Sequence, residues 1–203
     1  MTPGAVVLCG GESRRMGRPK AWLPFGPERL LQRVVRLAGT VARPVVVVAA
    51  PGQDIPELPD DVAVVRDPVA GRGPLQGLAA GFAAVPDSVE LIYATATDVP
   101  FLEPRWITRL VELMVGVDLV IPRIGGVLHP LAALYRKRAM LPVFESLLAQ
   151  DRLRLTSLAD AVPTLTVEEE DLRDVDPGFA TVRNLNQPED YERALRDAGL
   201  GRG

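Results

Sequence analysis

Two adjacent glycines followed by basic residues suggest that the amino-terminal part of the chain binds phosphate. Gly10 and Gly11 lack a Cβ, so the backbone there can approach a ligand closely and direct successive N–H groups at an anion. Arg15 and Lys20 follow shortly afterwards and add full positive charges. A sharp turn with solvated basic residues is the alternative interpretation, and the clustering of the charges favours a phosphate site.

Asp98 is a candidate ligand for a magnesium ion. It comes directly after an apolar run at 91–97 and opens the sequence D-V-P-F at 98–101. An ionised carboxylate at the end of a buried strand contributes little to packing, whereas Mg²⁺ prefers hard oxygen ligands of this kind. A turn-forming aspartate is the alternative, because Pro100 follows two residues later. The residues alone leave both interpretations open.

A second glycine-rich segment could hold a nucleobase. The sequence G-R-G-P-L-Q-G at 71–77 follows Asp67 and starts a helical pattern. Pro74 suits the first turn of a helix, and the glycines around it expose backbone N–H and C=O groups along which a planar base can lie. Arg72 adds a positive charge to this segment, in keeping with an anionic ligand nearby. An ordinary helix start explains the same residues equally well.

These residues must be positioned by a framework of alternating strands and helices. Uninterrupted apolar runs such as 5–9 are typical of strands that are covered on both faces of a parallel sheet. The alternation of such runs with helical patterns predicts an α/β fold with a three-layer, mostly parallel sheet. Ligands bind beyond the carboxyl ends of the strands in such sheets, so we expect the site in the loops that follow them. We expect strands at 5–9, 45–50, 62–65 and 91–97, helices at 28–37, 75–85 and 105–115, and further strands or helices at 118–121, 128–135, 139–150, 164–167 and 189–198.

Composition limits the classes of function. The chain has 203 residues, 47% of them apolar and 24% charged, which suits a single domain at 1–203. Its net charge of −3 argues against broad attraction to nucleic acid or to an anionic membrane. No apolar run reaches the length of a membrane span and the first residues do not resemble a signal peptide, so we expect a cytoplasmic protein. With one cysteine and one histidine, the chain must hold any metal through oxygens.

The segment L-C-G-G-E-S-R-R-M-G-R-P-K-A-W-L at 8–23 resembles the signature L-x-G-G-x-S-x-R-M-G-x-x-K of a family of nucleotidyltransferases. Its spacing fits neither the dinucleotide fingerprint G-x-G-x-x-G nor the P-loop, in which Ser or Thr follows Gly-Lys. In that family a doubly wound, Rossmann-like sheet carries the glycine loop, which wraps the triphosphate, and the lysine contacts phosphate. Cys9 replaces the usual small residue and is expected to pack rather than react. The resemblance implies nucleotide binding by Leu8, Cys9, Gly10, Gly11 and Lys20, and catalytic roles for Arg15 and Lys20.

Two further motifs extend this resemblance through a nucleotide half of the chain, at about 1–102. The family's G-P-L-x-G motif contacts the base and ribose, and an aspartate shortly before it takes part in base recognition. The family's D-x-P-F motif supplies a metal-binding aspartate at the end of a strand. The resemblance therefore implies nucleotide binding by Asp67, Gly73, Pro74, Leu75 and Gly77, and makes Asp98 a nucleotide-binding, catalytic and Mg²⁺-binding residue.

The acceptor half, at about 103–203, carries two more motifs. His129 begins H-P-L, which the family has near the acceptor, although a lone histidine beside a strand is more often structural. The sequence N-L-N-Q-P-E-D at 184–190 resembles the family's closing N-x-N-x-P-E-D. Asn184 and Asn186 could hydrogen-bond a pterin or help to arrange the metal end of the site, and Asn186 could instead be the N-cap of the next helix. The resemblance implies acceptor binding by His129, Asn184 and Asn186.

Within the family, the Gly-Gly pair and the chain length favour the enzymes that transfer GMP from GTP to the phosphate of molybdopterin, with Mg²⁺ as cofactor and pyrophosphate as product. An asparagine often seen after their second strand is absent, since A-A-P-G stands at 49–52, so transfer of CMP to molybdopterin or another sugar-phosphate-type transfer is the alternative. Proteins that deliver molybdopterin or receive the finished cofactor are implied as partners. A non-catalytic nucleotide-binding protein is a hypothesis of another class, and the presence of both Lys20 and Asp98 argues against it.

Overall fold

The computed structural model describes residues 1–10, 19–69 and 71–201, and these form one eight-stranded sheet. The strand order is β10-β7-β9-β6-β1-β4-β5, and β8 pairs with β7. Neighbouring strands run parallel except for β9, which is antiparallel to β6 and β7, and β8, which is antiparallel to β7. The strands are β1 (Gly4–Leu8), β4 (Val45–Ala49), β5 (Val62–Arg66), β6 (Leu91–Ala96), β7 (Leu119–Ile124), β8 (Val127–Leu128), β9 (Ala133–Arg136) and β10 (Thr164–Val167).

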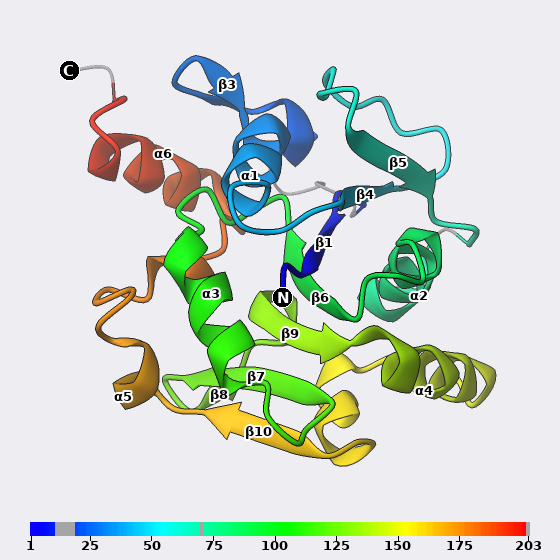
Figure 1. Cartoon of the computed structure of the whole chain (residues 1–203). Helices are drawn as coiled ribbons and strands as arrows, with labels where there is room; N and C mark the ends of the chain where they lie inside the picture. The colour runs from blue at the N-terminus through cyan, green and yellow to red at the C-terminus, as the bar shows by residue number, and fades with distance from the viewer. Residues whose placement is uncertain (11–18, 70, 202–203) are drawn as a thin grey trace.

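Helices cover both faces of the sheet (Figure 1). Val7 of β1 shares a buried cluster with α1 and α3, whereas Val6 shares another with α2 and α4. Successive strand residues point to opposite faces, which is why neighbours in β1 belong to different clusters. The predicted three-layer, doubly wound α/β fold with a mostly parallel sheet is confirmed. The helices are α1 (Leu30–Ala38), α2 (Pro74–Ala84), α3 (Pro104–Leu113), α4 (Lys137–Ala149), α5 (Glu169–Leu172) and α6 (Pro188–Asp197), with short 3₁₀ helices η1 (Lys20–Trp22), η2 (Pro130–Ala132), η3 (Leu155–Asp160) and η4 (Ala180–Val182).

The predicted strand or helix at 128–135 is instead three short elements. β8 ends at Leu128, η2 begins at Pro130, and β9 begins at Ala133. Proline fixes its φ angle and has no backbone N–H, so the chain cannot run through position 130 as a continuous ladder strand. The Tyr135 hydroxyl then donates to the Pro130 carbonyl at 2.6 Å, which fixes the turn.

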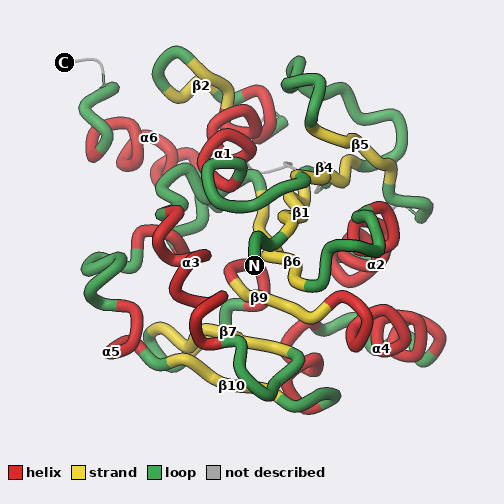
Figure 2. The backbone as a smooth tube through the Cα atoms, in the orientation of Figure 1, coloured by secondary structure: helices red, strands yellow, loops and turns green. Residues whose placement is uncertain are grey.

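Two other parts of the fold differ from a regular strand and helix alternation. The connection from β4 to β5 is a long loop without a helix (Figure 2). A small hairpin, β2 (Pro24–Phe25) and β3 (Glu28–Arg29), precedes α1, so that helix begins at Leu30 rather than at 28. Strands of two residues are too short to leave a periodic pattern in the sequence, and the hairpin was therefore not predicted.

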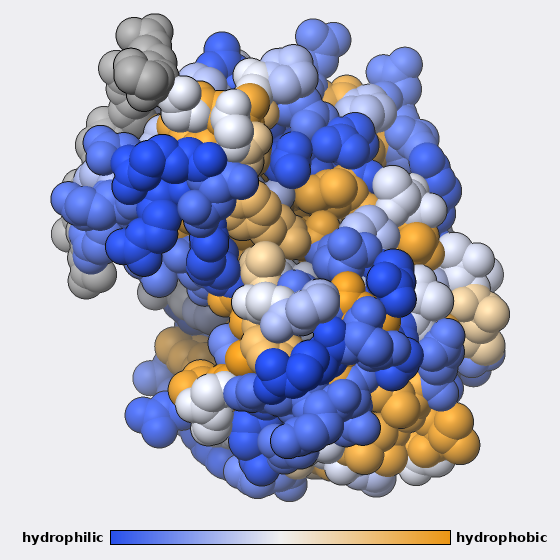
Figure 3. Space-filling model, turned by 90° about the vertical axis from the view of Figure 1, so that its left-hand side faces the viewer, coloured by the Kyte–Doolittle hydropathy of each residue, from blue (hydrophilic) through white to orange (hydrophobic). Residues whose placement is uncertain are grey.

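The outer surface is mainly hydrophilic on the side formed by α3, α5 and α6. Figure 3 shows small hydrophobic patches there, separated by hydrophilic side chains. Within the described residues, no helix combines the length and the apolar character that crossing a membrane requires.

Gly81 allows α2 to lie close against the sheet. A Cβ at this position would lie 2.5 Å from Val6 Cγ1 and 2.8 Å from Val48 Cγ2. We expect Gly81→Val to destabilise the protein by at least about 2 kcal/mol, because overpacking a tight core forces side chains and backbone to shift. Urea unfolding measures this effect. Gly178→Val is the matched control, since a Cβ there has no atom within 4 Å, and equal midpoints for the two variants would contradict the prediction.

Candidate functional site

The carboxyl ends of β1, β4, β5 and β6 lie along one edge of the sheet, because these strands are parallel neighbours. Hydrogen bonds join the loops that leave them: Thr97 donates to the Leu8 carbonyl through its backbone N–H at 3.0 Å and its hydroxyl at 3.1 Å. This edge therefore brings together predicted site residues from the loops after β1, β5 and β6. Gly11 and Arg15, also predicted for the site, lie outside the described residues.

Lys20 and Asp98 form an ion pair at this edge. The Lys20 ammonium lies 2.8 Å from Asp98 Oδ2, and the two side chains are 22% and 16% exposed. Lys20 begins η1 and Asp98 follows β6, so the fold joins two residues that are 78 positions apart in the sequence. The two side chains that the sequence predicts for phosphate and for metal are therefore in direct contact with each other.

The loop that carries Asp98 is held by the carboxyl-terminal part of the chain. The backbone N–H of Leu185 donates to the Asp98 carbonyl at 2.9 Å, and the Thr181 hydroxyl accepts from the Glu103 N–H at 3.1 Å. The Arg183 guanidinium lies 4.6 Å from the centre of the Phe101 ring. These contacts fix both ends of the loop at 98–103.

Helix α1 holds the same loop from the other side. The Arg33 side chain donates from Nε to the Pro100 carbonyl at 2.6 Å. Phe101 meets Phe25 edge to face, with ring centres 5.7 Å apart. The backbone around Asp98 is consequently restrained by two elements that are distant from it in the sequence.

Asn184 and Asn186 flank Leu185 and so stand next to the loop of Asp98. Both asparagines are exposed at the surface. The interpretation of Asn186 as the N-cap is wrong, because Gln187 is the N-cap of α6. The backbone N–H groups of Gln187 and Asn186 donate to the Asp190 carboxylate at 2.9 and 3.1 Å, and these bonds lower the pKa of Asp190. The amide side chains of Asn184 and Asn186 are thus not required as helix caps.

The start of the glycine loop is attached to the loop after β4. The Gln53 side chain accepts from the Ala50 N–H at 2.9 Å and donates to the Cys9 carbonyl at 3.0 Å. A Cβ on Gly10 would lie 3.5 Å from the Ala50 nitrogen, so the two loops are in close contact. Gln53 was not among the predicted residues, because nothing in its local sequence indicates a bond to a position 44 residues away.

Cys9 is a packed thiol at the end of β1. Its side chain is buried, and burial raises the pKa of the Cys9 thiol, with hydrogen bonds from Thr97 and Gln53 opposing that change only in part. A thiol with a raised pKa is protonated at neutral pH and is a weak nucleophile. The geometry agrees with the expectation that Cys9 packs rather than reacts.

The glycine-rich segment starts a helix as predicted, and the start of this helix, α2, lies against the end of β1. Gly73 is the N-cap with φ of +76°, a conformation that favours glycine, and Pro74 occupies the first turn. A Cβ on Gly77 would lie 3.1 Å from Leu8 Cδ2 and 3.9 Å from Asp67 Oδ2. The side chain of Leu75 is fully buried in the core, so only its backbone can meet a ligand.

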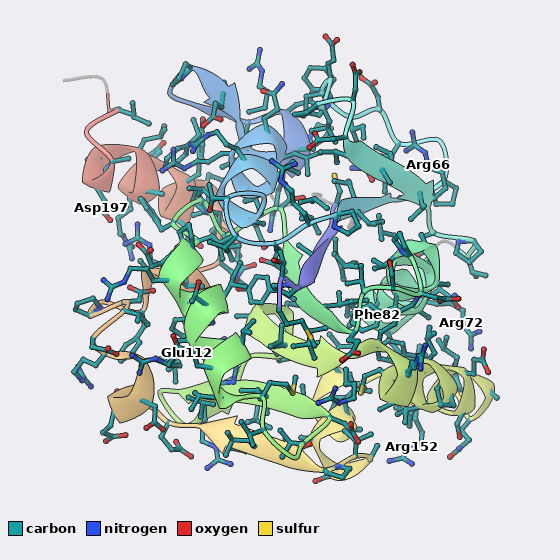
Figure 4. The ribbon with its side chains drawn as sticks, in the orientation of Figure 1. Arg66, Arg72, Phe82, Glu112, Arg152 and Asp197 are labelled. Carbon is teal, nitrogen blue, oxygen red and sulfur yellow. The ribbon has the colours of Figure 1, made fainter. Side chains whose placement is uncertain are left out.

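Arg72 is engaged at the end of α4. Its guanidinium donates to the Leu148 carbonyl at 3.0 Å and to Asp151 Oδ1 at 3.3 Å, at the carboxyl-terminal end of α4. Figure 4 shows Arg72 on this side of the molecule, away from Asp197 of α6. A helix carboxyl terminus attracts cations through its unpaired carbonyls. The expectation that Arg72 adds charge for an anionic ligand is therefore not supported by its position.

His129 lies on the same edge of the sheet, in the acceptor half. It precedes η2 and β9, and β9 starts beside the carboxyl-terminal half of β6, where Ala133 pairs with Ala94. Burial lowers the pKa of His129, while a hydrogen bond with the backbone of Ile124 opposes this change. The imidazole is therefore neutral at pH 7 and can offer a hydrogen bond without a charge.

Asp98 offers the kind of oxygen ligand that Mg²⁺ requires, but it has few acidic neighbours. In the part of the chain that the structure describes, no group of three or more His, Cys, Asp or Glu side chains could hold a metal ion. Mg²⁺ is commonly bound through one or two carboxylates and the phosphates of a substrate. The residues present fit an ion that is shared with a nucleotide rather than one held by the protein alone.

Comparison with known proteins agrees with this arrangement. The family described as the MobA-like NTP transferase domain matches residues 5–162. A protein of Mycobacterium bovis named as a probable molybdenum cofactor guanylyltransferase is 39% identical over 173 residues, covering 83% of this chain and 84% of the relative. A protein of the same name from Mycobacterium avium is 40% identical over 141 residues, covering 67% of this chain and 70% of the relative.

Solved structures share the fold at low sequence identity. The molybdopterin-guanine dinucleotide biosynthesis protein A of Archaeoglobus fulgidus superposes with a TM-score of 0.78 at 22% identity, covering 97% of this chain and 98% of the other. The 2-C-methyl-D-erythritol 4-phosphate cytidylyltransferase of Thermus thermophilus gives a TM-score of 0.71 at 17% identity, covering 98% of this chain and all of the other (100%). At these identities the likeness concerns the fold alone.

Proposed function

Because the chain belongs to the family of MobA-like NTP transferases, we propose that it transfers GMP from GTP to the phosphate of molybdopterin and releases pyrophosphate. The contact between Lys20 and Asp98 at the carboxyl edge of the sheet is the observation that carries this proposal. It joins a cation suited to phosphate with a carboxylate suited to a divalent cation, in a family of nucleotide transferases. The names of the mycobacterial relatives support guanylyl transfer to molybdopterin in particular.

Nucleotidyl transfer depends on positioning and on neutralising charge more than on covalent help from the protein. An oxygen of the acceptor phosphate forms a bond to the α-phosphorus, while the bond from the α-phosphorus to the bridging oxygen breaks and its electron pair leaves with pyrophosphate. Lys20, with Arg15 and the backbone N–H groups of the glycine loop, would neutralise the departing pyrophosphate. The roles of Gly11 and Arg15 rest on the motif alone.

Asp98 would hold Mg²⁺ together with phosphate oxygens of the nucleotide, and the bound ion would neutralise charge on the transferred group. Base and ribose would lie along the start of α2, whose N-cap is Gly73. Gly77 lies there against Leu8, with the Asp67 carboxylate beside it. With these roles the chain would divide into a nucleotide half at about 1–102 and an acceptor half at about 103–203.

The acceptor would bind beside the loop of Asp98. Asn184 and Asn186 are exposed there and carry amides that can pair with the amide edge of a pterin. His129 lies on the same edge as a neutral imidazole, which can complement a polar but uncharged group. Neutral hydrogen-bonding groups on this side match an acceptor whose charge is concentrated on its phosphate.

The proposal is tested by offering [α-³²P]GTP and [α-³²P]CTP, each with molybdopterin and Mg²⁺, and measuring labelled product and pyrophosphate. We expect turnover with GTP and much less with CTP. Preference for CTP would assign the chain to cytidylyl transfer, in keeping with the absence of an asparagine from the sequence A-A-P-G at 49–52. Nucleotide binding without pyrophosphate release would contradict an enzymatic function altogether.

A further inference from the structure

The Lys20–Asp98 ion pair joins two groups that the proposed function assigns to different ligands. The Lys20 ammonium lies 2.8 Å from the Asp98 carboxylate, and a triphosphate that engaged its three N–H donors and its charge would weaken this contact. We infer that the nucleotide triphosphate competes with Asp98 for Lys20, and that removing Lys20 from Asp98 makes the carboxylate available to the divalent cation. Metal and nucleotide would then bind with positive coupling. This inference rests on the proposed function for the ligands of Lys20 and Asp98, but not for the base or the acceptor.

Electrostatics opposes the binding of a metal ion while the pair is intact. The ammonium is in contact with one carboxylate oxygen, and both side chains are mostly shielded from solvent, so screening by water is incomplete. A divalent cation brought to the same carboxylate would be repelled by the ammonium beside it. Since the described residues include no acidic cluster that could hold a metal without Asp98, free metal has no better position nearby.

The exchange requires movement of the lysine rather than of the aspartate. The Asp98 carbonyl accepts from the Leu185 N–H, and the preceding residue, Thr97, is bonded to the Leu8 carbonyl. The backbone of Asp98 is therefore fixed on both sides. Lys20 carries its charge on a flexible four-carbon stem, so the ammonium can turn from carboxylate to phosphate while its backbone stays in η1.

Two opposite effects of Asp98→Asn follow from this competition. Without metal, GTP that binds to the wild type must displace the Asp98 carboxylate from Lys20. Asp98→Asn removes this competitor and is expected to tighten GTP binding. With Mg²⁺, the same substitution removes the metal ligand and is expected to weaken GTP binding. Calorimetry on Asp98→Asn should therefore show tighter GTP binding than the wild type in EDTA and weaker GTP binding than the wild type in Mg²⁺.

A double-mutant cycle separates this competition from simple repulsion between Asp98 and phosphate. GTP is titrated in EDTA into the wild type, Lys20→Met, Asp98→Asn and the double variant. We expect Asp98→Asn to tighten binding by about five- to tenfold when Lys20 is present, in the usual range of coupling between sites, and to give no gain in the Lys20→Met background. An equal gain in both backgrounds would show repulsion alone, and no gain in either would also overturn the inference.

A second measurement covers the case in which the variants bind nucleotide too weakly to titrate. Mn²⁺ binding without nucleotide is followed by electron paramagnetic resonance, and Lys20→Met should bind Mn²⁺ more tightly than the wild type by about the same five- to tenfold factor. Asp98→Asn should lower Mn²⁺ binding in either background. Unchanged Mn²⁺ affinity in Lys20→Met would contradict the inference directly.

The Lys137–Asp87 pair provides a matched control. The Lys137 ammonium lies 2.7 Å from Asp87 Oδ1. The Lys137 backbone N–H donates to the carbonyl of Glu90, which precedes β6 at the opposite edge of the sheet. Asp87→Asn should change neither GTP nor Mn²⁺ affinity.

Titrating CTP in parallel distinguishes this inference from the proposed function. Coupling between metal and CTP together with absent turnover of GTP would contradict the proposed function alone. Turnover of GTP without coupling between metal and nucleotide would contradict only this inference.

Discussion

Replacing Lys20 by alanine is expected to lower kcat by about 10²–10³-fold, the usual effect of removing one group that stabilises charge in a transition state. The ammonium would neutralise charge that develops on pyrophosphate as the bond to the α-phosphorus breaks. The fold should be unaffected, because Lys20 is partly exposed at the start of a three-residue 3₁₀ helix and its ion pair with Asp98 lies at the carboxyl edge of the sheet. Pyrophosphate release and the melting temperature, measured on the same sample, check both statements.

Two variants make this result specific. Lys20→Arg keeps the charge but replaces a compact ammonium with a planar guanidinium, so we expect activity between that of the wild type and that of Lys20→Ala. Arg152→Ala removes an exposed cation beyond the end of α4 and should leave turnover unchanged. Near-normal turnover of Lys20→Ala would exclude Lys20 from the mechanism.

The edge of the sheet that carries the candidate site could be predicted because it depends on local patterns. The apolar runs at 5–9 and 45–50 correspond to β1 and β4, which are buried along their whole length. Once both are strands of a parallel sheet, the loops after them must share one edge. The position of Asp98 next to Lys20 follows from that edge, although the direct contact between their side chains does not.

The support around Asp98 could not be predicted, because it comes from hydrogen bonds between distant parts of the chain. The Thr181 hydroxyl and the Glu103 N–H are 78 positions apart, and neither residue belongs to a periodic pattern that would pair them. The bond between Gln53 and Cys9 is of the same kind. Such contacts form only once the loops are packed together in the folded chain, and no local pattern in the sequence specifies them.

The direction of β9 and the position of Arg72 were missed for related reasons. An apolar run gives the existence of a strand but not its orientation, and β9 is antiparallel to both of its neighbours. Arg72 stands in a glycine-rich segment that suggested an anionic ligand, yet its guanidinium donates to the Leu148 carbonyl at the end of α4. A charged side chain of this length can reach several partners, so its position in the sequence does not determine which one it meets.

Replacing Asp98 by alanine is expected to reduce Mg²⁺-dependent turnover by about 10³-fold or more, because the ion would lose its protein ligand and the transferred phosphoryl group its main counter-charge. The protein should remain folded, since it is the backbone carbonyl of Asp98, and not the carboxylate, that accepts from Leu185. Turnover measured against Mg²⁺ concentration, with EDTA as the zero point, distinguishes lost metal binding from a lower maximal rate.

Asp87→Asn is the control for this result. It removes the carboxylate of the Lys137–Asp87 pair and leaves the carboxyl edge of the sheet unchanged. That variant should retain wild-type dependence on Mg²⁺. If Asp98→Ala also retained it, the metal would have to be held by phosphate oxygens and other protein groups, and the Lys20–Asp98 contact would be an ordinary structural ion pair. Loss of Mg²⁺ dependence in Asp98→Ala alone would instead assign the divalent cation to this carboxylate.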